Sequence, residues 1–556
     1  MAFQLSAGVN VSEIDLTTVV PSVSSSTGAF AGKFSWGPVN EIVTISDEVR
    51  LAQRFGQPTN TNYEYWFSAA NFLAYSNNLK VVRAAGSGTL NATSANGGIL
   101  IENSTDYTVN HSAGANTNGA FAAKYAGELG NSIRIEMCDA NTYASWPTDY
   151  KVQFTDAPAT SDYVTDVRGA NDEIHILVID TLGKFSGTSN TVLEKFAFVS
   201  KASDAKINDG TSNYYKDVLN NRSNYVWWLN HVAGTNWGTA GSNTSFSLMS
   251  SASSIQLTSG ADGTIAANNI VTAYDQVANP DAIDISLIIT GPADATIAGA
   301  VIDIANVRKD CVVFVSPERS DVVDNYGSET TDILSYRNSL TSSSYAVMDS
   351  GWKYQYDKYN DTYRWVPLNG DIAGLCARTD LERDPWFSPA GANRGIIRNI
   401  VKLSWNPNKA DRDDLYTKGV NPVVTFAGEG TMLFGDKTML SRPSAFDHIN
   451  VRRLFIVLEK SVARAARSSL FEFNDQFTRA QFVNLVEPYL RDVQGRRGIT
   501  DFRVVCDETN NTPEVIDRNE FVGDIYIKPT RSVNYIQLNF IAVRTGVRFE
   551  EIVGRF

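Results

Sequence analysis

The order of apolar and polar positions predicts a compact α/β unit near the start of the chain. Apolar runs indicate strands over residues 27–34 and 80–83, and helical spacing indicates helices over residues 47–55 and 63–76. Upstream, residues 8–14 alternate between apolar and polar as a lone strand would, and Pro21 with the serines after it indicates a hinge. An isolated strand cannot satisfy its own backbone groups, so this arm is expected to pair with another sheet.

The middle of the chain carries three further patterns. Residues 86–120 are rich in Gly, Ser, Thr and Asn, and strand patterns then follow over residues 133–137, 151–154 and 173–180, so we expect an inserted β-rich domain. The strand–helix–strand order over residues 283–316 predicts a parallel pair joined by a crossover helix. Alternating aromatic residues over 352–365 predict a hairpin.

The last part of the chain predicts helices over residues 451–471 and 479–494, followed by strands over 502–506, 521–527 and 535–543. Taken together, the patterns predict a multidomain protein of mixed α/β and α+β class. Its expected parts are an N-terminal arm (1–20), a first α/β core part (21–90), an inserted β-rich outer domain (91–190), an α/β domain (191–395) and a C-terminal α+β domain (396–556).

Composition narrows the class of partner. Apolar residues make up 43% of the chain and the formal net charge is −13, so the chain can bury cores but lacks the basic surface of a general nucleic-acid coat. The most membrane-like stretch, residues 285–307, is interrupted by Gly291-Pro292 and carries Asp294 and Asp303. We therefore expect no direct nucleic-acid contact and no membrane insertion. The four scattered cysteines are expected to be small buried hydrophobes.

Sequence motifs for enzyme chemistry are missing. The four histidines are isolated from one another, and neither a zinc-protease motif nor the GxSxG hydrolase motif occurs. Residues 430–438 resemble a phosphate-binding loop, but Asp436 stands before the lysine, where its carboxylate would repel phosphate. The sequence thus predicts no catalytic residue, no cofactor and no metal. The alternative from another class is a carbohydrate-active enzyme that stacks sugars on the aromatic hairpin, although packing on a sheet face is the expected role of those rings.

The helix predicted over residues 451–471 carries the most informative local pattern. Its apolar positions fall on one side and are expected to pack on the chain's own domain. Four basic residues fall within roughly 60° of one another on the opposite side, and we call them the basic stripe: Arg453, Lys460, Arg464 and Arg467. One interpretation is a solvated helix face. The other is a docking surface for an acidic partner, which is favoured because the apolar residues Ile456, Val457 and Phe471 lie nearby.

Both ends of the chain are predicted to be strands without a partner of their own. Each end alternates apolar and polar residues beyond a hinge, so each resembles a donor strand for the open sheet edge of a neighbouring subunit. The residues expected to take part in this exchange are Val9, Val11 and Ile14 at the start and Ile536, Leu538 and Phe540 at the end. The alternative is that both ends fold back on their own subunit.

Several segments resemble the contractile tail sheath family of bacteriophages. The most specific is the Arg-Asp-Pro-Trp-Phe-Ser-Pro-Ala-Gly-Ala-Asn-Arg-Gly run at residues 383–395. The carboxy-terminal part is similar to the family's last domain through residues 449–453, 471–475, 504–507 and 511–513. Further matches occur in family order at residues 8–9, 34–38, 82–84, 124–131 and 260–263. The resemblance covers nearly the whole chain and is weakest over residues 86–120 and 135–255.

This resemblance implies a structural protein rather than an enzyme. Its subunits would form hexameric rings, stacked helically around a tail tube, and would contract to drive that tube through the bacterial envelope for genome ejection. Expected partners are other copies of the chain, the tail tube protein, and baseplate and tail terminator proteins. The expected location is the virion tail, with assembly in the host cytoplasm. In such a sheath the basic stripe would dock on the tube, the C-terminal domain would lie near it, and the inserted domain would face outward.

Two other contractile machines share these features, so the alternatives within the class are a bacteriocin sheath and a secretion-system sheath. A secretion sheath usually divides its parts between two smaller chains. The present chain holds all the parts at once, which favours a phage or bacteriocin sheath.

Overall fold

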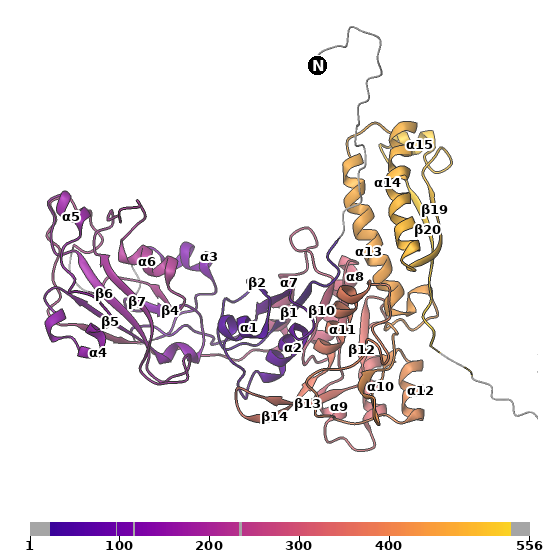
Figure 1. Ribbon diagram of the computed structural model, residues 1–556, viewed down its shortest axis with the longest axis horizontal. Coiled ribbons are helices and arrows are strands. Elements are labelled where there is room, and N and C mark those ends of the chain that lie inside the picture. Colours follow the sequence, from indigo (N-terminus) through magenta and orange to yellow (C-terminus); the bar gives the residue numbers. More distant parts are fainter. Residues whose placement is uncertain (1–22, 96, 115–116, 233–235, 535–536, 538–556) are drawn as a thin grey trace, which may run out of the picture. The chain divides into compact units, whose positions relative to one another are not determined.

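The computed structural model describes residues 23–95, 97–114, 117–232, 236–534 and 537, and the chain forms two compact units, Met1–Leu470 and Phe471–Phe556 (Figure 1). We call them the N-terminal and the C-terminal unit. Within the described residues, no helix combines the length and the apolar character that crossing a bilayer requires.

A seven-stranded sheet forms the core of the N-terminal unit. Its strand order is β16-β12-β11-β10-β1-β3-β2, and every neighbouring pair is parallel except β2 with β3. Strands β1, β10, β11 and β12 are buried along their whole length, which is the pattern of strands covered on both faces. The strands are β1 (Gly28–Gly32), β2 (Ile42–Ile45), β3 (Leu79–Arg83), β10 (Leu287–Ile289), β11 (Val312–Val315), β12 (Ala346–Asp349) and β16 (Val420–Asn421).

Helices cover this sheet in packed pairs, α7 with α8 and α2 with α11. Helix α2 lies close to β1, because a Cβ added at Gly28 would meet the ring of Phe72 at 2.6 Å and one at Gly32 would meet Tyr65 at 2.7 Å. The predicted crossover is confirmed, since β10 and β11 are parallel and α8 lies between them in the chain. The helices are α1 (Glu48–Phe55), α2 (Tyr63–Leu73), α7 (Ala267–Asp275), α8 (Ala295–Arg308), α9 (Arg319–Val322), α10 (Glu329–Ser339), α11 (Asn369–Glu382), α12 (Lys409–Thr417) and α13 (Ile449–Ala466).

The β-rich insertion lies between β3 and α7 in the chain. Its main sheet is antiparallel with the order β7-β6-β5-β9, and β4 pairs with β8. The predicted end of the insertion at residue 190 is too early, because β7 begins one residue later and hydrogen-bonds to β6. Its elements are β4 (Phe121–Ala123), β5 (Ile133–Asp139), β6 (Glu173–Asp180), β7 (Thr191–Ser200), β8 (Val226–Trp228), β9 (Ser253–Gln256), α3 (Ser104–Asp106), α4 (Thr148–Lys151), α5 (Asp162–Asp166) and α6 (Tyr215–Arg222).

One predicted strand of the insertion is wrong. Residues 151–154 end the short helix α4 and continue as a turn. The Phe154 ring stacks on the imidazole of His175, with 4.0 Å between ring centres. Phe154 therefore packs on β6 without joining the sheet, whereas Val152 is 70% exposed.

The two connections of the insertion run side by side as a neck. Ser87 is bridged to Thr264, Leu90 to Ala261, and Thr93 to Thr258, all antiparallel. The Asn131 side chain fastens the neck, because its amide donates to the Gly260 carbonyl and accepts from the Gly260 N–H, at 2.9 and 2.8 Å. The chain therefore leaves and re-enters the core at nearly the same place.

The aromatic hairpin is confirmed as β13 (Trp352–Asp357) and β14 (Thr362–Pro367), with β15 (Lys402–Leu403) on the other side of β13. A second hairpin pairs β17 (Val423–Phe426) with β18 (Gly430–Leu433), and β18 occupies the segment that resembled a phosphate loop. The predicted boundary between residues 395 and 396 separates β16 from β12, the strand to which it hydrogen-bonds. Residues 396–470 therefore belong to the N-terminal unit.

The C-terminal unit consists of helix α14 packed on a two-stranded antiparallel sheet. Its elements are α14 (Gln476–Gly495), β19 (Ile499–Val505), α15 (Pro513–Asp517) and β20 (Asp524–Pro529). The strand predicted over residues 535–543 lies outside the described residues except for residue 537, and the strand predicted over residues 8–14 lies wholly outside them.

Candidate functional site

Helix α13 forms where its apolar spacing predicts, but it covers Ile449–Ala466, so the predicted end at residue 471 is wrong by five residues and Arg467 lies just beyond the helix. Val451, Leu454 and Leu458 are buried in the N-terminal unit. Ile456, which was expected beside the basic stripe on the surface, is also buried, at 3% exposure. The helix is therefore buried over a wider arc than one apolar stripe would give, and its N-terminal half is enclosed on nearly every side.

This enclosure changes the role of the first stripe residue. Arg453 is 3% exposed, and its guanidinium pairs with the carboxylate of Asp380 in α11 and donates to the carbonyl of Cys376. Burial raises the pKa of Asp380, and Arg453 opposes that rise. The expectation that Arg453 lies on an exposed docking face is therefore wrong for the isolated chain, because the side chain points into the core.

The other three members of the basic stripe contact an acidic loop of their own unit. Lys460 Nζ lies 2.9 Å from Asp284 Oδ1 and donates to the Ile285 carbonyl at 2.6 Å. Arg464 lies 3.2 Å from the second oxygen of Asp284. Arg467 is 4.0 Å from Asp281, and both side chains are largely exposed. The charges become more accessible toward the end of the helix.

Sequence reasoning missed the acidic partners of the stripe. Asp281 and Asp284 precede β10 and Asp380 lies in the last turn of α11, so no local spacing connects them with α13. The one available signal was the pair of carboxylates in the short run 279–284, directly before a buried strand. The positive charges of the basic stripe are therefore paired with carboxylates of the same chain. Neither the interpretation as a solvated face nor that as a free docking surface included such pairing.

The strand-exchange residues at both ends, Val9, Val11, Ile14, Ile536, Leu538 and Phe540, lie outside the described residues. The structure does describe the sheet on which such strands would add. Strands β19 and β20 pair only with each other among the described strands. Phe502 and Val504 face Ile527 and Ile525 across this pair, and all four side chains are only half-buried. Among the described residues, both edges of this sheet are therefore open and its apolar face is incompletely covered.

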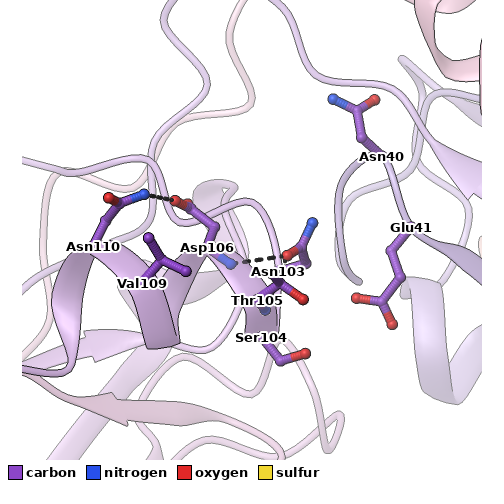
Figure 2. A pocket seen from close by; sticks show the side chains of 8 residues that line it. All are labelled: Asn40, Glu41, Asn103, Ser104, Thr105, Asp106, Val109 and Asn110. Carbon is purple, nitrogen blue, oxygen red and sulfur yellow. Dashed lines mark hydrogen bonds between the residues drawn. The ribbon is translucent and has the colours of Figure 1, made fainter.

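A pocket of about 550 Å³ lies between the loop at Asn40 and the start of α3 (Figure 2). Asn103 accepts hydrogen bonds from the backbone N–H groups of Thr105 and Asp106, both at 3.1 Å. Asn110 in turn donates to Asp106 at 2.7 Å, as the dashed lines show. These polar groups serve the local helix start, so their arrangement supports a structural role.

The two segments that raised enzyme alternatives also have structural partners. Asp436 accepts hydrogen bonds from the Tyr416 hydroxyl at 3.2 Å and from His448 at 3.0 Å, so its carboxylate fixes the start of α13. On the aromatic hairpin, Tyr354 lies against Trp365 with a tilt of 45° between the rings. Tyr354 also stacks on Tyr363, so the rings pack on one another along the hairpin, while Tyr356 and Tyr363 are about half exposed.

Metal-ligand chemistry finds little support in the described part of the chain. There, no group of three or more His, Cys, Asp or Glu side chains has a geometry that would hold a metal ion. The four cysteines are free and buried, as the sequence predicts.

Three family models match the chain in order. The Tail sheath protein Gp18 domain III N-terminal region matches residues 26–84, the Phage tail sheath protein central domain matches 261–439, and the Phage tail sheath C-terminal domain matches 441–542. The unmatched residues between the first two matches carry the insertion. The family boundaries thus agree with the neck as the place where the insertion leaves the core.

Curated relatives match along the full length. The chain is 33% identical to the tail sheath protein of Enterobacteria phage T4, over 99% of each chain, and 32% identical to that of Vibrio phage KVP40, over 99% of this chain and 100% of the relative.

Solved structures share the fold. A sheath tail protein from Listeria innocua superposes with a TM-score of 0.54 at 12% identity, over 92% of this chain and 96% of that one. The helical sheath of the anti-feeding prophage in its contracted state gives 0.51 at 11% identity, over 97% and 99%. These likenesses confirm a mixed α/β multidomain fold.

Proposed function

Because the chain belongs to the phage tail sheath family, we propose that it is a contractile sheath subunit that polymerises around a tail tube and drives that tube through the bacterial envelope. Its role is structural rather than enzymatic. Its partners are other copies of the chain, the tube protein, and the baseplate and terminator proteins at the two ends of the tail. It assembles in the host cytoplasm and ends in the virion tail.

The observation that carries this proposal is the open two-stranded sheet of the C-terminal unit. A two-stranded sheet gains stability from further strands or from packing against a helix, and here α14 packs on β19 while both sheet edges lack a partner among the described strands. The apolar face formed by Phe502 and Ile527 is half-exposed. An added strand would hydrogen-bond to a sheet edge, and its own apolar side chains would bury more of that face. A subunit built this way is completed by its neighbours.

The chain ends are the proposed donors. The strand around Val9, Val11 and Ile14 and the strand around Ile536, Leu538 and Phe540 would add to the β19–β20 sheets of neighbouring subunits. Each ladder hydrogen bond contributes about 1 kcal/mol net, so several per strand would hold rings together. Hinges beside the strands would let the rings rotate during contraction while those bonds stay intact.

A proline substitution tests strand exchange more sharply than a truncation. Val11→Pro removes a backbone donor and disrupts the added strand, whereas Val11→Thr keeps the donor and the β-branched shape. We expect the proline variant to remain a folded monomer and the threonine variant to form tubes visible by negative-stain electron microscopy. Normal tubes from both variants, and from a chain lacking residues 1–20, would rule out exchange by the N-terminal arm.

We also propose that the exposed end of the basic stripe, Arg464 and Arg467, docks on the tube, with Lys460 adding to the local charge. Contacts of this exposed kind contribute roughly 0–1 kcal/mol each, and a sheath that slides along its tube needs contacts that release. The double reversal Arg464→Glu/Arg467→Glu should prevent coating of tubes but leave tubeless sheath polymers intact. Arg168→Glu/Lys206→Glu is the matched control, because it changes the net charge equally at two exposed positions of the insertion.

A further inference from the structure

The described part of the chain begins beside the basic stripe. Ser24 is the second described residue, and its carbonyl accepts a hydrogen bond of 2.9 Å from the Ser286 hydroxyl. The same hydroxyl accepts a hydrogen bond of 3.2 Å from Lys460 Nζ. One residue later, the Ser25 carbonyl accepts a hydrogen bond of 3.4 Å from the guanidinium of Arg453. The N-terminal arm is therefore attached to the fold next to two members of the stripe.

The positive charge of the stripe is only partly compensated by the described residues. Asp284 is shared between Lys460 and Arg464, so one carboxylate faces two cations. The other carboxylate near Lys460 belongs to Asp310, and it already accepts two hydrogen bonds, of 2.8 and 2.9 Å, from the guanidinium of Arg308. The second half of the stripe therefore keeps a positive potential, and the Arg464 side chain is 45% exposed there.

The N-terminal arm carries the complementary charge. Glu13 and Asp15 are its only charged side chains, because the first Lys or Arg of the chain is Lys33. The opposite end of the chain, residues 535–556, contains three arginines and two glutamates, so its formal charge is 3 − 2 = +1. Electrostatic complementarity therefore favours the arm over the C-terminal end as the occupant of the stripe.

The arm is also long enough to follow the stripe. Arg453, Val457 and Arg464 are spaced by four and seven residues, so they lie along one face of α13. Arg464 lies about 17 Å along the helix from Arg453, at 1.5 Å per residue. The chain from Ser24 back to Asp15 can span up to about 30 Å when extended. The carboxylates of the arm can therefore reach the exposed end of the stripe.

We propose that Glu13 and Asp15 bind the exposed end of the basic stripe of the same subunit before assembly. This contact rests on the proposed function, because it occupies both surfaces used there: it keeps the arm from a neighbour's sheet edge and the stripe from the tube. Transfer of the arm to a neighbouring sheet then uncovers Arg464 and Arg467. Exposed ion pairs are weak and release readily, while attachment to the same chain keeps the arm at high local concentration.

A disulfide tests this contact directly in the monomer. Leu16→Cys/Ala463→Cys places one thiol beside Asp15 and the other on an exposed position of α13, and it leaves all the proposed charges in place. At low salt this variant should form an intramolecular disulfide at least tenfold faster than Leu16→Cys/Ser335→Cys, whose second thiol is exposed on α10. The advantage should fall at about 1 M salt, where charges are screened. The four native cysteines are buried and should not compete.

Charge exchange shows whether the pairing is specific. In the variant with thiols at positions 16 and 463, Glu13→Lys/Asp15→Lys should slow disulfide formation at least tenfold, and the further change Arg464→Glu/Arg467→Glu should restore it. Without added cysteines, Glu13→Gln/Asp15→Asn should shorten the lag before tubeless sheath polymers form at least threefold, because the arm is released. Glu13→Asp/Asp15→Glu keeps both charges and should polymerise as the unaltered chain does.

Each outcome supports or overturns the contact. Disulfide formation no faster than in the control, or unaffected by charge reversal, overturns it. A disulfide that joins two subunits overturns the assignment to the same subunit. Faster reaction of Ala463→Cys with Val547→Cys than with Leu16→Cys would assign the surface to the C-terminal end and overturn the arm as its occupant. If the monomer forms the expected disulfide but the unaltered chain never forms sheath polymers, the contact is supported and the proposed function is wrong.

Discussion

The ammonium group of Lys460 lies 2.9 Å from the carboxylate of Asp284, a residue 176 positions earlier in the chain. Arg464 binds the same carboxylate from the next turn of α13. This shared acid partly neutralises the basic stripe, so a tube that binds the stripe competes with Asp284. The balance between internal pairing and docking therefore depends mainly on Asp284, with Asp310 as a second partner 3.6 Å from Lys460.

The variant Asp284→Asn should strengthen docking if the stripe binds the tube. Removing the shared carboxylate frees Lys460 and Arg464 from their ion pairs with Asp284. Each such exposed pair contributes about 0–1 kcal/mol, and this free energy no longer opposes docking. We expect the salt concentration that strips sheath from tubes to rise. An unchanged or lower value would show that the stripe serves only its own fold. The conservative control Asp284→Glu keeps the charge and should behave as the unaltered chain does.

Removing one partner of the buried pair Arg453–Asp380 should be strongly destabilising. Both side chains are almost fully buried, so Arg453→Met leaves an uncompensated carboxylate in the core, at a cost of about 3–5 kcal/mol. The double variant Arg453→Met/Asp380→Leu should recover most of that loss, because no buried charge remains. Thermal unfolding of both variants measures the difference. A double variant no more stable than the single one would contradict this account.

Two glycine substitutions should have opposite effects. A Cβ at Gly370 in α11 would lie 2.2 Å from the backbone carbonyl oxygen of Ser68 in α2. The variant Gly370→Ala therefore forces two packed helices apart and should lower the free energy of unfolding by about 1–3 kcal/mol. Gly299 lies inside α8 with open space around its Cα, so Gly299→Ala should stabilise the chain by about 0.5–1 kcal/mol. Shifts of the thermal midpoint in the same direction for both would refute the packing argument.

The pair His448–Asp436 predicts a pH-dependent contribution to stability. The hydrogen bond that His448 donates to the carboxylate of Asp436 raises the pKa of His448 above its ordinary value of 6.5, although burial opposes this. A raised pKa in the folded state means that the stabilisation is complete below 6.5 and is lost as the pH rises through the folded value. The thermal midpoint difference between the unaltered chain and His448→Asn should therefore be larger at about pH 5.5 than at about pH 8.5. Equal differences would argue against a charged pair.

Excision of the insertion should leave the core able to fold. Ser87 and Thr264 are hydrogen-bonded, with 2.9 Å between the Thr264 nitrogen and the Ser87 oxygen, so a short glycine linker can replace residues 88–263. Trp36, which packs against Tyr125 of the insertion, would become exposed and lower stability modestly. Circular dichroism and tube formation are the measurements, and folded chains without tubes would show that the insertion takes part in assembly.

A shorter deletion provides the contrast to that excision. Deleting residues 90–190 removes β5 and β6 but keeps β7 and β9, which pair only with them among the described strands. Unpaired strands of this kind expose backbone groups and favour aggregation. We therefore expect this chain to be insoluble, and a soluble product that forms tubes would contradict the boundary given by the neck.

Much of the local structure follows from the sequence because the signals are local. Helix α13 and the hairpin β13–β14 have the right periodicity over enough residues, and the parallel pair β10–β11 follows from the order of its elements. The helix predicted over residues 47–55 begins one residue later, at Glu48, because the Asp47 side chain caps it by accepting a hydrogen bond from the N–H of Arg50.

Domain limits and charge partners were decided by the tertiary structure. Residue 190 was predicted as the end of the insertion, but only the ladder between β6 and β7 shows that the strands on both sides of it belong to one sheet. The sequence alone determined that a helix forms in this segment and that basic residues gather on one side of it, although Arg467 lies just beyond the end of α13. Whether each of those charges faces core, carboxylate or water depended on which distant segments lie beside it. Arg453 pairs with Asp380 and Lys460 pairs with Asp284 because the fold places α11 and the loop before β10 against α13. These contacts join segments far apart in the sequence, so the local spacing of residues cannot predict them.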